Sequence, residues 1–150
     1  MAAFLIFTGH LAANRIQRCM TKDTIHDIGV ASQIGQYSDA VEISGNGRLL
    51  FISGTPGLAP DGTLPKTFEG QAEQAWKNVV ALLNKAGMGP EHLVKVTQYL
   101  TRAEDIPAYR PIRSKYLTDN RPAFMLAVIP GLVRPEFLIE IEAYASAPPR

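Results

Sequence analysis

The sequence predicts a single α+β domain in which two helices lie on one face of a mixed β-sheet. Strand-patterned and helix-patterned runs follow one another in the order β-β-α-β-α-β-β, so each helix stands between strands. With 150 residues the chain is long enough for one hydrophobic core. Antiparallel hairpins are expected at both ends of the chain. An arrangement with both helices on one face of the sheet buries the apolar sides of these helices and strands against each other.

The first half is expected to hold a hairpin followed by a long helix. A short strand at 39–43 and a second at 49–53 flank Gly45-Asn46-Gly47, which is typical of a hairpin turn. The segment 54–65 contains three glycines and three prolines and is expected to be a loop. Thr67 can cap a helix that Gly87 ends. Its apolar positions recur at helical spacing: Ala72, Ala75, Trp76, Val79, Val80, Leu83 and Ala86.

The second half is expected to continue with strand 93–101, a second helix, and closing strands at about 123–129 and 137–145. The helix should begin near Asp105 with Pro107 in its first turn, where the missing N–H costs little. Pro111 lacks the N–H that would bond back to Pro107, which predicts a kink or a late start. The inward-facing positions of this helix are Ile106, Tyr109, Ile112, Tyr116 and Leu117.

The final strand carries two carboxylates on one face. Between Phe137 and Ala145 the odd-numbered side chains are apolar, whereas Glu140, Glu142 and Tyr144 share the other face with Leu138. A carboxylate on a half-buried surface is costly unless it has a partner. We therefore expect this strand to contribute an acid to a cleft.

Composition excludes several classes of function. A net charge of +1 with scattered basic residues argues against a nucleic-acid surface. The single cysteine, Cys19, rules out an internal disulfide and suits a reducing compartment, so a cytoplasmic protein is expected. His10, His26 and His92 have no metal-ligand spacing, and no metal site is expected.

The first twenty residues are interpreted as an N-terminal extension to a domain at 21–150. The apolar run at 2–7 is far shorter than the roughly 20 residues that a membrane span needs, so no membrane partner is expected. No basic residue precedes this run, which is unlike a secretory signal. The extension is expected to be peripheral to function.

Five short motifs carry a resemblance to the RidA (YjgF/YER057c/UK114) family. They occur in the family's order, and the match covers about residues 24 to 146. Residues 34–38 (IGQYS) resemble IGPYS, 51–57 (FISGTPG) resemble FVSGQIP, and 94–101 (VKVTQYLT) resemble VVKVTVFLTD, while 121–123 (RPA) and 139–143 (IEIEA) resemble the PPAR and IEIEA motifs.

The resemblance implies a fold, an assembly and an activity. RidA-like proteins are chorismate-mutase-like α+β domains that form homotrimers with ligand clefts between subunits. Family deaminases hydrolyse reactive 2-imino acids and their enamine tautomers to 2-keto acids and ammonia, without a cofactor. Some relatives carry the label endoribonuclease L-PSP. The homotrimer that the resemblance implies would also explain why many strand positions are apolar on both faces, because helices cover only one face of the sheet and the other needs a partner chain.

Motif by motif, the resemblance assigns candidate site residues. The family's acid falls on Glu140 and its aromatic hydroxyl on Tyr37, so these are the expected catalytic residues. Ser53 and Gly54 fall in the substrate-binding SGQIP motif. Each has a purely structural alternative: an ion-paired strand carboxylate for Glu140, an interface aromatic for Tyr37, and a turn at Ser53-Gly54.

The chain departs from the family at one decisive position. Family deaminases carry an arginine directly after the Pro-Ala pair, where this chain has Phe124. A phenylalanine cannot hold a carboxylate, and the loss of such a charged contact costs on the order of 2–5 kcal/mol. Arg110 or Arg134 are the candidate replacements, and a solvent-exposed helix residue and a surface ion pair, respectively, are the alternatives.

Two functions therefore remain open. One is an imine or enamine hydrolase with an altered carboxylate clamp, which the joint presence of Tyr37, Ser53-Gly54 and Glu140 favours. The other is a non-catalytic homotrimer that binds a small molecule in the same cleft, made more apolar by Phe124, Met125 and Leu126.

Overall fold

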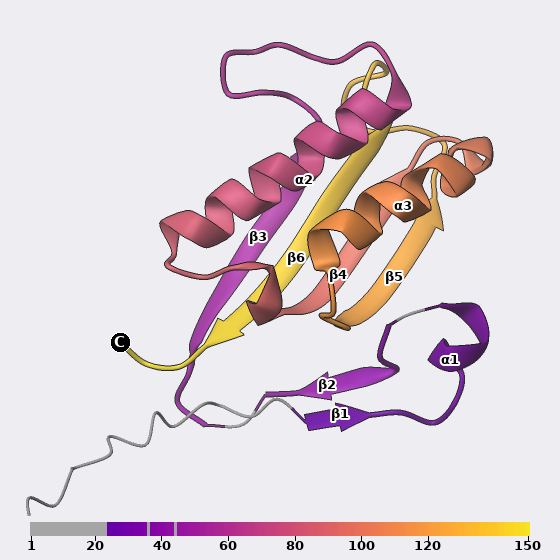
Figure 1. Ribbon diagram of the computed structural model, residues 1–150. Helices are drawn as coiled ribbons and strands as arrows, with labels where there is room; N and C mark the ends of the chain where they lie inside the picture. Colours follow the sequence, from indigo (N-terminus) through magenta and orange to yellow (C-terminus); the bar gives the residue numbers. More distant parts are fainter. Residues whose placement is uncertain (1–23, 36, 44) are drawn as a thin grey trace, which may run out of the picture.

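Two helices lie side by side across one face of a four-stranded sheet (Figure 1). The computed structural model describes residues 24–35, 37–43 and 45–150. The expected extension at 1–20, including Cys19, lies outside the described residues. The α+β class with both helices on one sheet face is confirmed. Within the described part of the chain, no helix is long and apolar enough to cross a membrane.

The main sheet has the strand order β3-β6-β4-β5. Strand β3 (Arg48–Pro56) pairs antiparallel with β6 (Ile139–Ala147), which also pairs antiparallel with β4 (Leu93–Leu100). Strand β5 (Ala123–Val128) joins β4 in parallel and leaves β5 at the edge. The parallel pair results from the crossover through α3 (Ile106–Leu117), because such a connection returns the chain in the same direction.

Both expected terminal hairpins are wrong. Strand β2 (Ala40–Glu42) pairs with β1 (Thr24–His26) in a separate two-stranded ribbon, not with β3. At the other end β5 does not pair with β6, because β6 enters the middle of the sheet. The physical reason is burial: the odd-numbered side chains of β6 are buried almost completely, and a central position buries them best. Strand β3 also extends to Pro56, into the segment expected to be a loop.

Helix α2 (Phe68–Lys85) agrees with its sequence pattern. The hydroxyl of Thr67 accepts a hydrogen bond from the N–H of Gly70, and Gly87 follows the helix with φ +67°. Helix α3 begins at Ile106 and continues through Pro111, so the expected late start does not occur. Short 3-10 turns, η1 (Pro90–His92) and η2 (Ala103–Asp105), precede β4 and α3.

The hydrophobic core lies between the two helices and the sheet. Trp76 and Val79 of α2 and Tyr109 of α3 are fully buried, and they pack on the inward side chains of the four strands. Leu93 belongs to the core whereas Val94 does not, because a register shift between Leu93 and Lys95 turns Val94 to the face that carries Leu49 and Phe51. The opposite face carries exposed apolar side chains, including Leu49, Phe51 and Met125.

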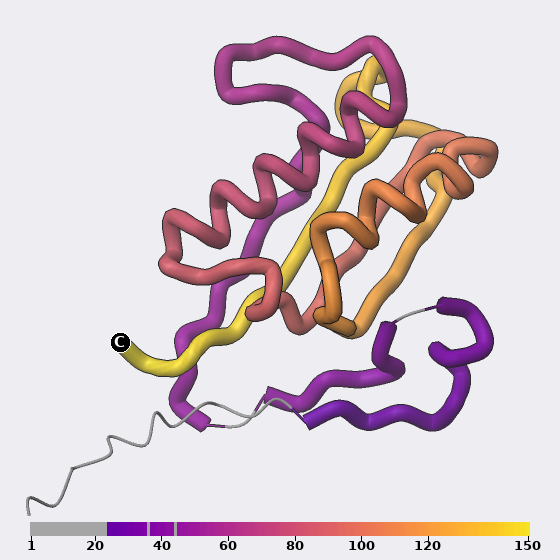
Figure 2. Tube along the Cα trace, in the orientation of Figure 1, coloured from indigo at the N-terminus to yellow at the C-terminus, as the bar shows by residue number. Residues whose placement is uncertain are grey.

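The β1–β2 ribbon and the short helix α1 (Ala31–Ile34) lie at the β5 end of the sheet, as the indigo part of the trace shows (Figure 2). Ser38 forms an isolated parallel bridge with Ala123 at the start of β5. This contact brings a segment from the beginning of the domain beside the edge strand, about eighty residues later in the chain.

Candidate functional site

The register of the sheet separates the sequence-predicted site residues between its two faces. Phe124 is level with Val96 and Ala143, which belong to the core, so its ring lies on the helix-covered face. Glu140 is level with Tyr99 of β4 and points to the opposite, open face. Within one copy of the chain, these two residues therefore do not share a cleft.

On the open face, Glu140 lies directly against Gly54. The sheet register pairs Glu140 with Pro56 of β3. A Cβ atom added to Gly54 would collide with the carboxylate of Glu140, so the absence of a side chain at Gly54 makes room for the acid. Ser53 and Gly54 stand at a register shift between Ile52 and Thr55, which interrupts the ladder at this point. Ser53, Gly54 and Glu140 are thus brought together.

The two carboxylates of β6 have different environments. Glu142 accepts a hydrogen bond of 3.1 Å from the Tyr144 hydroxyl. Glu140 has no hydrogen-bond or ion-pair partner among the described residues, and burial raises the pKa of its carboxyl. A half-buried carboxyl with a raised pKa is suited to accept and return a proton, whereas Glu142 has a structural partner.

On the helix-covered side, Tyr37 is held against the start of β5. The hydroxyl of Ser38 donates to the carbonyl of Arg121 at 2.7 Å, and the Arg121 guanidinium donates to the carbonyl of Tyr37 at 3.1 Å. The Tyr37 ring lies 5.9 Å from the Phe124 ring, centroid to centroid. Tyr37 and Ser38 are therefore anchored to the start of β5, the strand that carries Phe124.

The preceding turn is organised by Asp39. Its carboxylate accepts hydrogen bonds from the N–H groups of Ile28, Gly29 and Ala31, at 2.8 to 3.1 Å. Desolvation acts to raise the pKa of Asp39, but these N–H groups outweigh it and hold the pKa below its usual value. The ionised carboxylate thus fixes the turn that leads into α1 and the pocket described next.

A pocket of about 370 Å³ opens at the β5 edge. It is bounded by α3, by the segment around Tyr37 and by β5, and both Phe124 and Met125 line it, so it extends around the edge strand. Four sequence-predicted site residues meet here: Tyr37, Arg110, Phe124 and Leu126. The other lining residues are Ile34, Gly35, Ile106, Arg113 and Met125.

Arg113 lines this pocket with a positive charge, although it is not among the residues that the sequence predicts for the site. Its guanidinium carbon lies 4.5 Å from the centroid of the Phe124 ring, which is a cation–π contact. Burial of the guanidinium, and secondarily the charge of Arg110, lower the pKa of Arg113. The available signal was spacing: Arg113 follows Arg110 by three positions, and such residues share a helix face.

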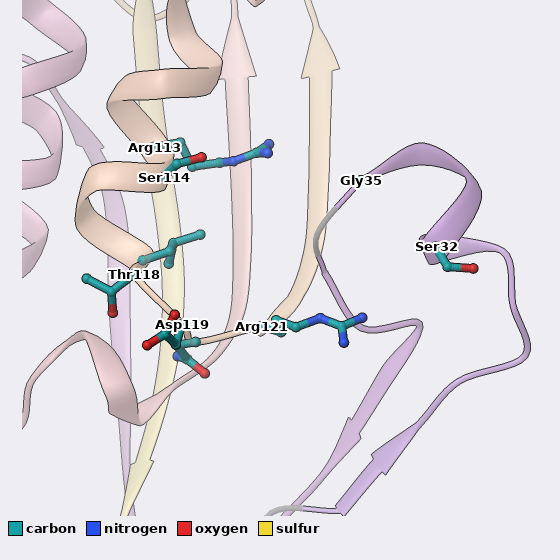
Figure 3. A pocket seen from close by; sticks show the side chains of 9 residues that line it. Ser32, Gly35, Arg113, Ser114, Thr118, Asp119 and Arg121 are labelled. Atoms are coloured by element: carbon teal, nitrogen blue, oxygen red, sulfur yellow. The ribbon is translucent and has the colours of Figure 1, made fainter.

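Arg113 also borders a second, adjoining pocket of about 380 Å³. Figure 3 shows its side chain running from α3 toward the neighbouring strands, with the Arg121 side chain below it pointing toward the α1 segment. Gly35 is the other residue common to both pockets. Arg113 therefore lines two neighbouring pockets on this side of the molecule.

Arg134 is not part of this cluster. Its guanidinium carbon lies 5.4 Å from the ring centroid of Phe137, in the segment that leads into β6. The structure thus forms one group from Ser53, Gly54 and Glu140, a second from Tyr37, Arg110, Phe124 and Leu126, and leaves Arg134 apart from both. Among the described residues, no group of three or more His, Cys, Asp and Glu side chains is placed to hold a metal ion.

Comparison with known proteins agrees with this arrangement of strands and motifs. The family model described as Endoribonuclease L-PSP matches residues 29–147. The chain belongs to the RidA (YjgF) family. A RutC family protein from Pyrococcus abyssi is 30% identical over 128 residues, which cover 84% of this chain and 98% of that one. The resemblance predicted from the five motifs is thereby confirmed.

Two other RidA-family relatives bear on activity and fold. The 2-iminobutanoate/2-iminopropanoate deaminase of Mus musculus is 33% identical over 117 residues, 75% of this chain and 82% of the mouse protein. A Rid family protein of unknown function from Yersinia pestis superimposes with a TM-score of 0.73 at 26% identity, covering 83% of this chain and 98% of that one. The fold is thus that of the RidA family.

Proposed function

We propose that this RidA-family chain is a hydrolase of the imine/enamine deaminase type. The observation that carries the proposal is Glu140, a half-buried carboxyl with a raised pKa and no partner among the described residues, which fits against Gly54 because that residue has no side chain. The name of the mouse relative, a 2-iminobutanoate/2-iminopropanoate deaminase, supports the same class of reaction.

In the proposed reaction, Glu140 takes a proton from a water molecule, and the resulting hydroxide adds to the carbon of the C=N bond. Glu140 passes this proton to the imine nitrogen, which gives a neutral tetrahedral carbinolamine with one C–O and one C–N single bond. Glu140 then takes the proton of the carbinolamine hydroxyl and transfers it to the amino nitrogen. The C–N bond breaks, and ammonia leaves as the carbonyl forms. Water is consumed and no electrons are transferred, so the chain's residues suffice for the proton transfers.

The proposed active site is shared between copies of the chain in a homotrimer. One copy presents the acid on its open face, whereas Tyr37, Arg110 and Phe124 lie around the β5 edge on the other side. A complete cleft then needs the open face of one copy against the β5 edge of the next. The exposed Leu49, Phe51 and Met125 on that face support a covering partner. Sedimentation velocity tests the assembly.

A non-catalytic ligand-binding role is the second candidate. It is favoured by the lining of the pocket, because Phe124, Leu126, Ile34 and Ile106 give it a largely apolar wall. In this role the Glu140 carboxyl would contribute to ligand binding or to subunit contact rather than to proton transfer.

The deciding experiment generates 2-iminopropanoate and 2-iminobutanoate in situ and follows their disappearance with the wild type, Glu140→Gln and Glu142→Gln. Glu142 is the matched control because it lies two residues away on the same strand and face. Removal of the general base is expected to lower the rate by about 10²- to 10⁴-fold, whereas Glu142→Gln retains activity. Wild-type rates at the uncatalysed level for both compounds would reject the hydrolase and favour the binding role.

A further inference from the structure

The pocket at the β5 edge contains two positive charges and no negative one. Arg110 and Arg113 line it, and its other described lining residues are all uncharged. Neither arginine forms an ion pair with a carboxylate of the described residues, although Arg102, Lys115 and Arg121 nearby each do. Like charges on one helix face repel each other, so this pair is at its most favourable when an anion binds between them.

The aromatic ring of Phe124 holds the Arg113 guanidinium in position. A guanidinium stacked at 4.5 Å from the ring centroid is oriented without using its N–H donors. Those donors remain available to a ligand in the pocket. The half-buried position of Arg113 also weakens its hydration, which strengthens a contact with an anion.

Arg113 therefore brings a positive charge from α3 to the place on β5 where family deaminases carry an arginine and this chain carries Phe124. The Arg113 guanidinium lies over the Phe124 ring, and both side chains line the same pocket. Phe124 therefore contributes to the site, because its ring supports the Arg113 guanidinium.

We propose that Arg113, stacked on Phe124 and assisted by Arg110, binds the carboxylate of a 2-imino or 2-oxo acid that carries a bulky apolar side chain. The inference deepens the proposed function and rests on it for the nature of the reacting group. The volume of about 370 Å³ exceeds what a two- or three-carbon side chain fills, and Ile34, Ile106 and Leu126 provide apolar contacts for a larger one.

The test measures binding of stable keto acids by isothermal titration calorimetry to the full chain. The probes are pyruvate, 4-methyl-2-oxopentanoate and the uncharged 4-methyl-2-oxopentanamide. We expect 4-methyl-2-oxopentanoate to bind more tightly than the other two. Arg113→Gln is expected to weaken its binding by about 10- to 100-fold, because a charge-assisted hydrogen bond is lost.

Two variants serve as comparisons. Arg150→Gln removes the same charge from the exposed C-terminus, where Arg150 donates to the carbonyl of Ala86, and should leave binding unchanged. Arg134→Gln removes a second arginine that is stacked on a phenylalanine, but outside the pocket. A loss of binding in Arg134→Gln with none in Arg113→Gln would overturn the inference, as would equal affinity for the acid and the amide.

Failure of the inference can be distinguished from failure of the proposed function. Binding that depends on Arg113 in a chain that hydrolyses no imine, including the imine of 4-methyl-2-oxopentanoate, would retain the anion site and reject the hydrolase. Turnover that depends on Glu140 but not on Arg113 would retain the hydrolase and overturn the anion site. Absence of any binding by the wild type at millimolar probe, with the circular dichroism spectrum of a folded chain, also overturns it.

Discussion

Phe124 and Glu140 lie on opposite faces of the same sheet, two strands apart. Phe124 on β5 is level with Val96, and Glu140 on β6 is level with Tyr99, so the strand alternation directs their side chains away from each other. The acid and the divergent position can act on one ligand only if two copies of the chain meet. This relationship determines which substitutions are informative.

Substitution of Glu140 by glutamine should raise stability at neutral pH. The folded-state pKa of Glu140 is raised by burial, so the ionised form is less favourable in the folded chain than in the unfolded chain. Below the unfolded-state pKa of about 4.3 the carboxyl is protonated in both states, so the folded chain keeps its full stability. Part of that stability is lost as the pH rises from this value through the higher folded-state pKa. We expect a higher Tm for Glu140→Gln at pH 7 and equal values near pH 4.

The same shift predicts the pH dependence of hydrolysis. Because the base must be ionised, the rate should rise with pH, with a midpoint above the ordinary glutamate pKa. A pH–rate profile of the wild type checks this expectation. A midpoint at or below the ordinary value would contradict the assignment of Glu140 as the base.

We expect the double exchange of Phe124 and Arg113 to lower the free energy of unfolding less than either single substitution does. Phe124→Arg alone places a second guanidinium against Arg113 in a half-buried site and should cost about 1–3 kcal/mol of stability. Phe124→Arg combined with Arg113→Phe restores one ring and one cation. Urea unfolding of the two single variants and the double variant measures the coupling, and additive effects would show that the contact contributes nothing.

Gly54→Ala should impair activity more than stability. The new methyl group would collide with the Glu140 carboxyl, which is the end of a flexible side chain and can move aside. We expect a rate loss of tenfold or more, on the order of 1.4 kcal/mol in the barrier, with a Tm close to that of the wild type. Gly131→Ala is the matched control, since nothing lies within 4 Å of the Cβ it would add.

Gln71 should be the most sensitive polar position of the core. Its amide donates to the carbonyls of Pro65 and Glu136, and its side-chain oxygen accepts from the N–H of Leu138 at 2.9 Å. Gln71→Leu leaves these backbone groups unpaired in a buried site and should cost about 2–4 kcal/mol. Gln74→Leu, at a half-buried position of the same helix, should change the free energy of unfolding far less, as urea denaturation will show.

Periodicity alone predicted strand β2, the four strands of the main sheet and helices α2 and α3, whereas β1 and α1 were not expected. The stripe from Ala72 to Leu83, the Thr67 cap and the alternation along 137–145 all describe local relations between residues a few positions apart. Backbone geometry ties such spacing to one face of a helix or strand, so no tertiary information is needed. The motifs likewise identified the family, including its departure at Phe124.

Pairing and proximity were decided only by the tertiary structure. The alternation of apolar and polar residues predicts which face of the sheet a side chain occupies, but not which strand lies beside it. The position of β6 between β3 and β4 follows from the burial of its apolar face in the folded chain. The same limit hid Arg113, because a contact between α3 and β5 depends on how the helix crosses the sheet. Gln71 was missed for a related reason: its partners lie in two loops that meet only after folding.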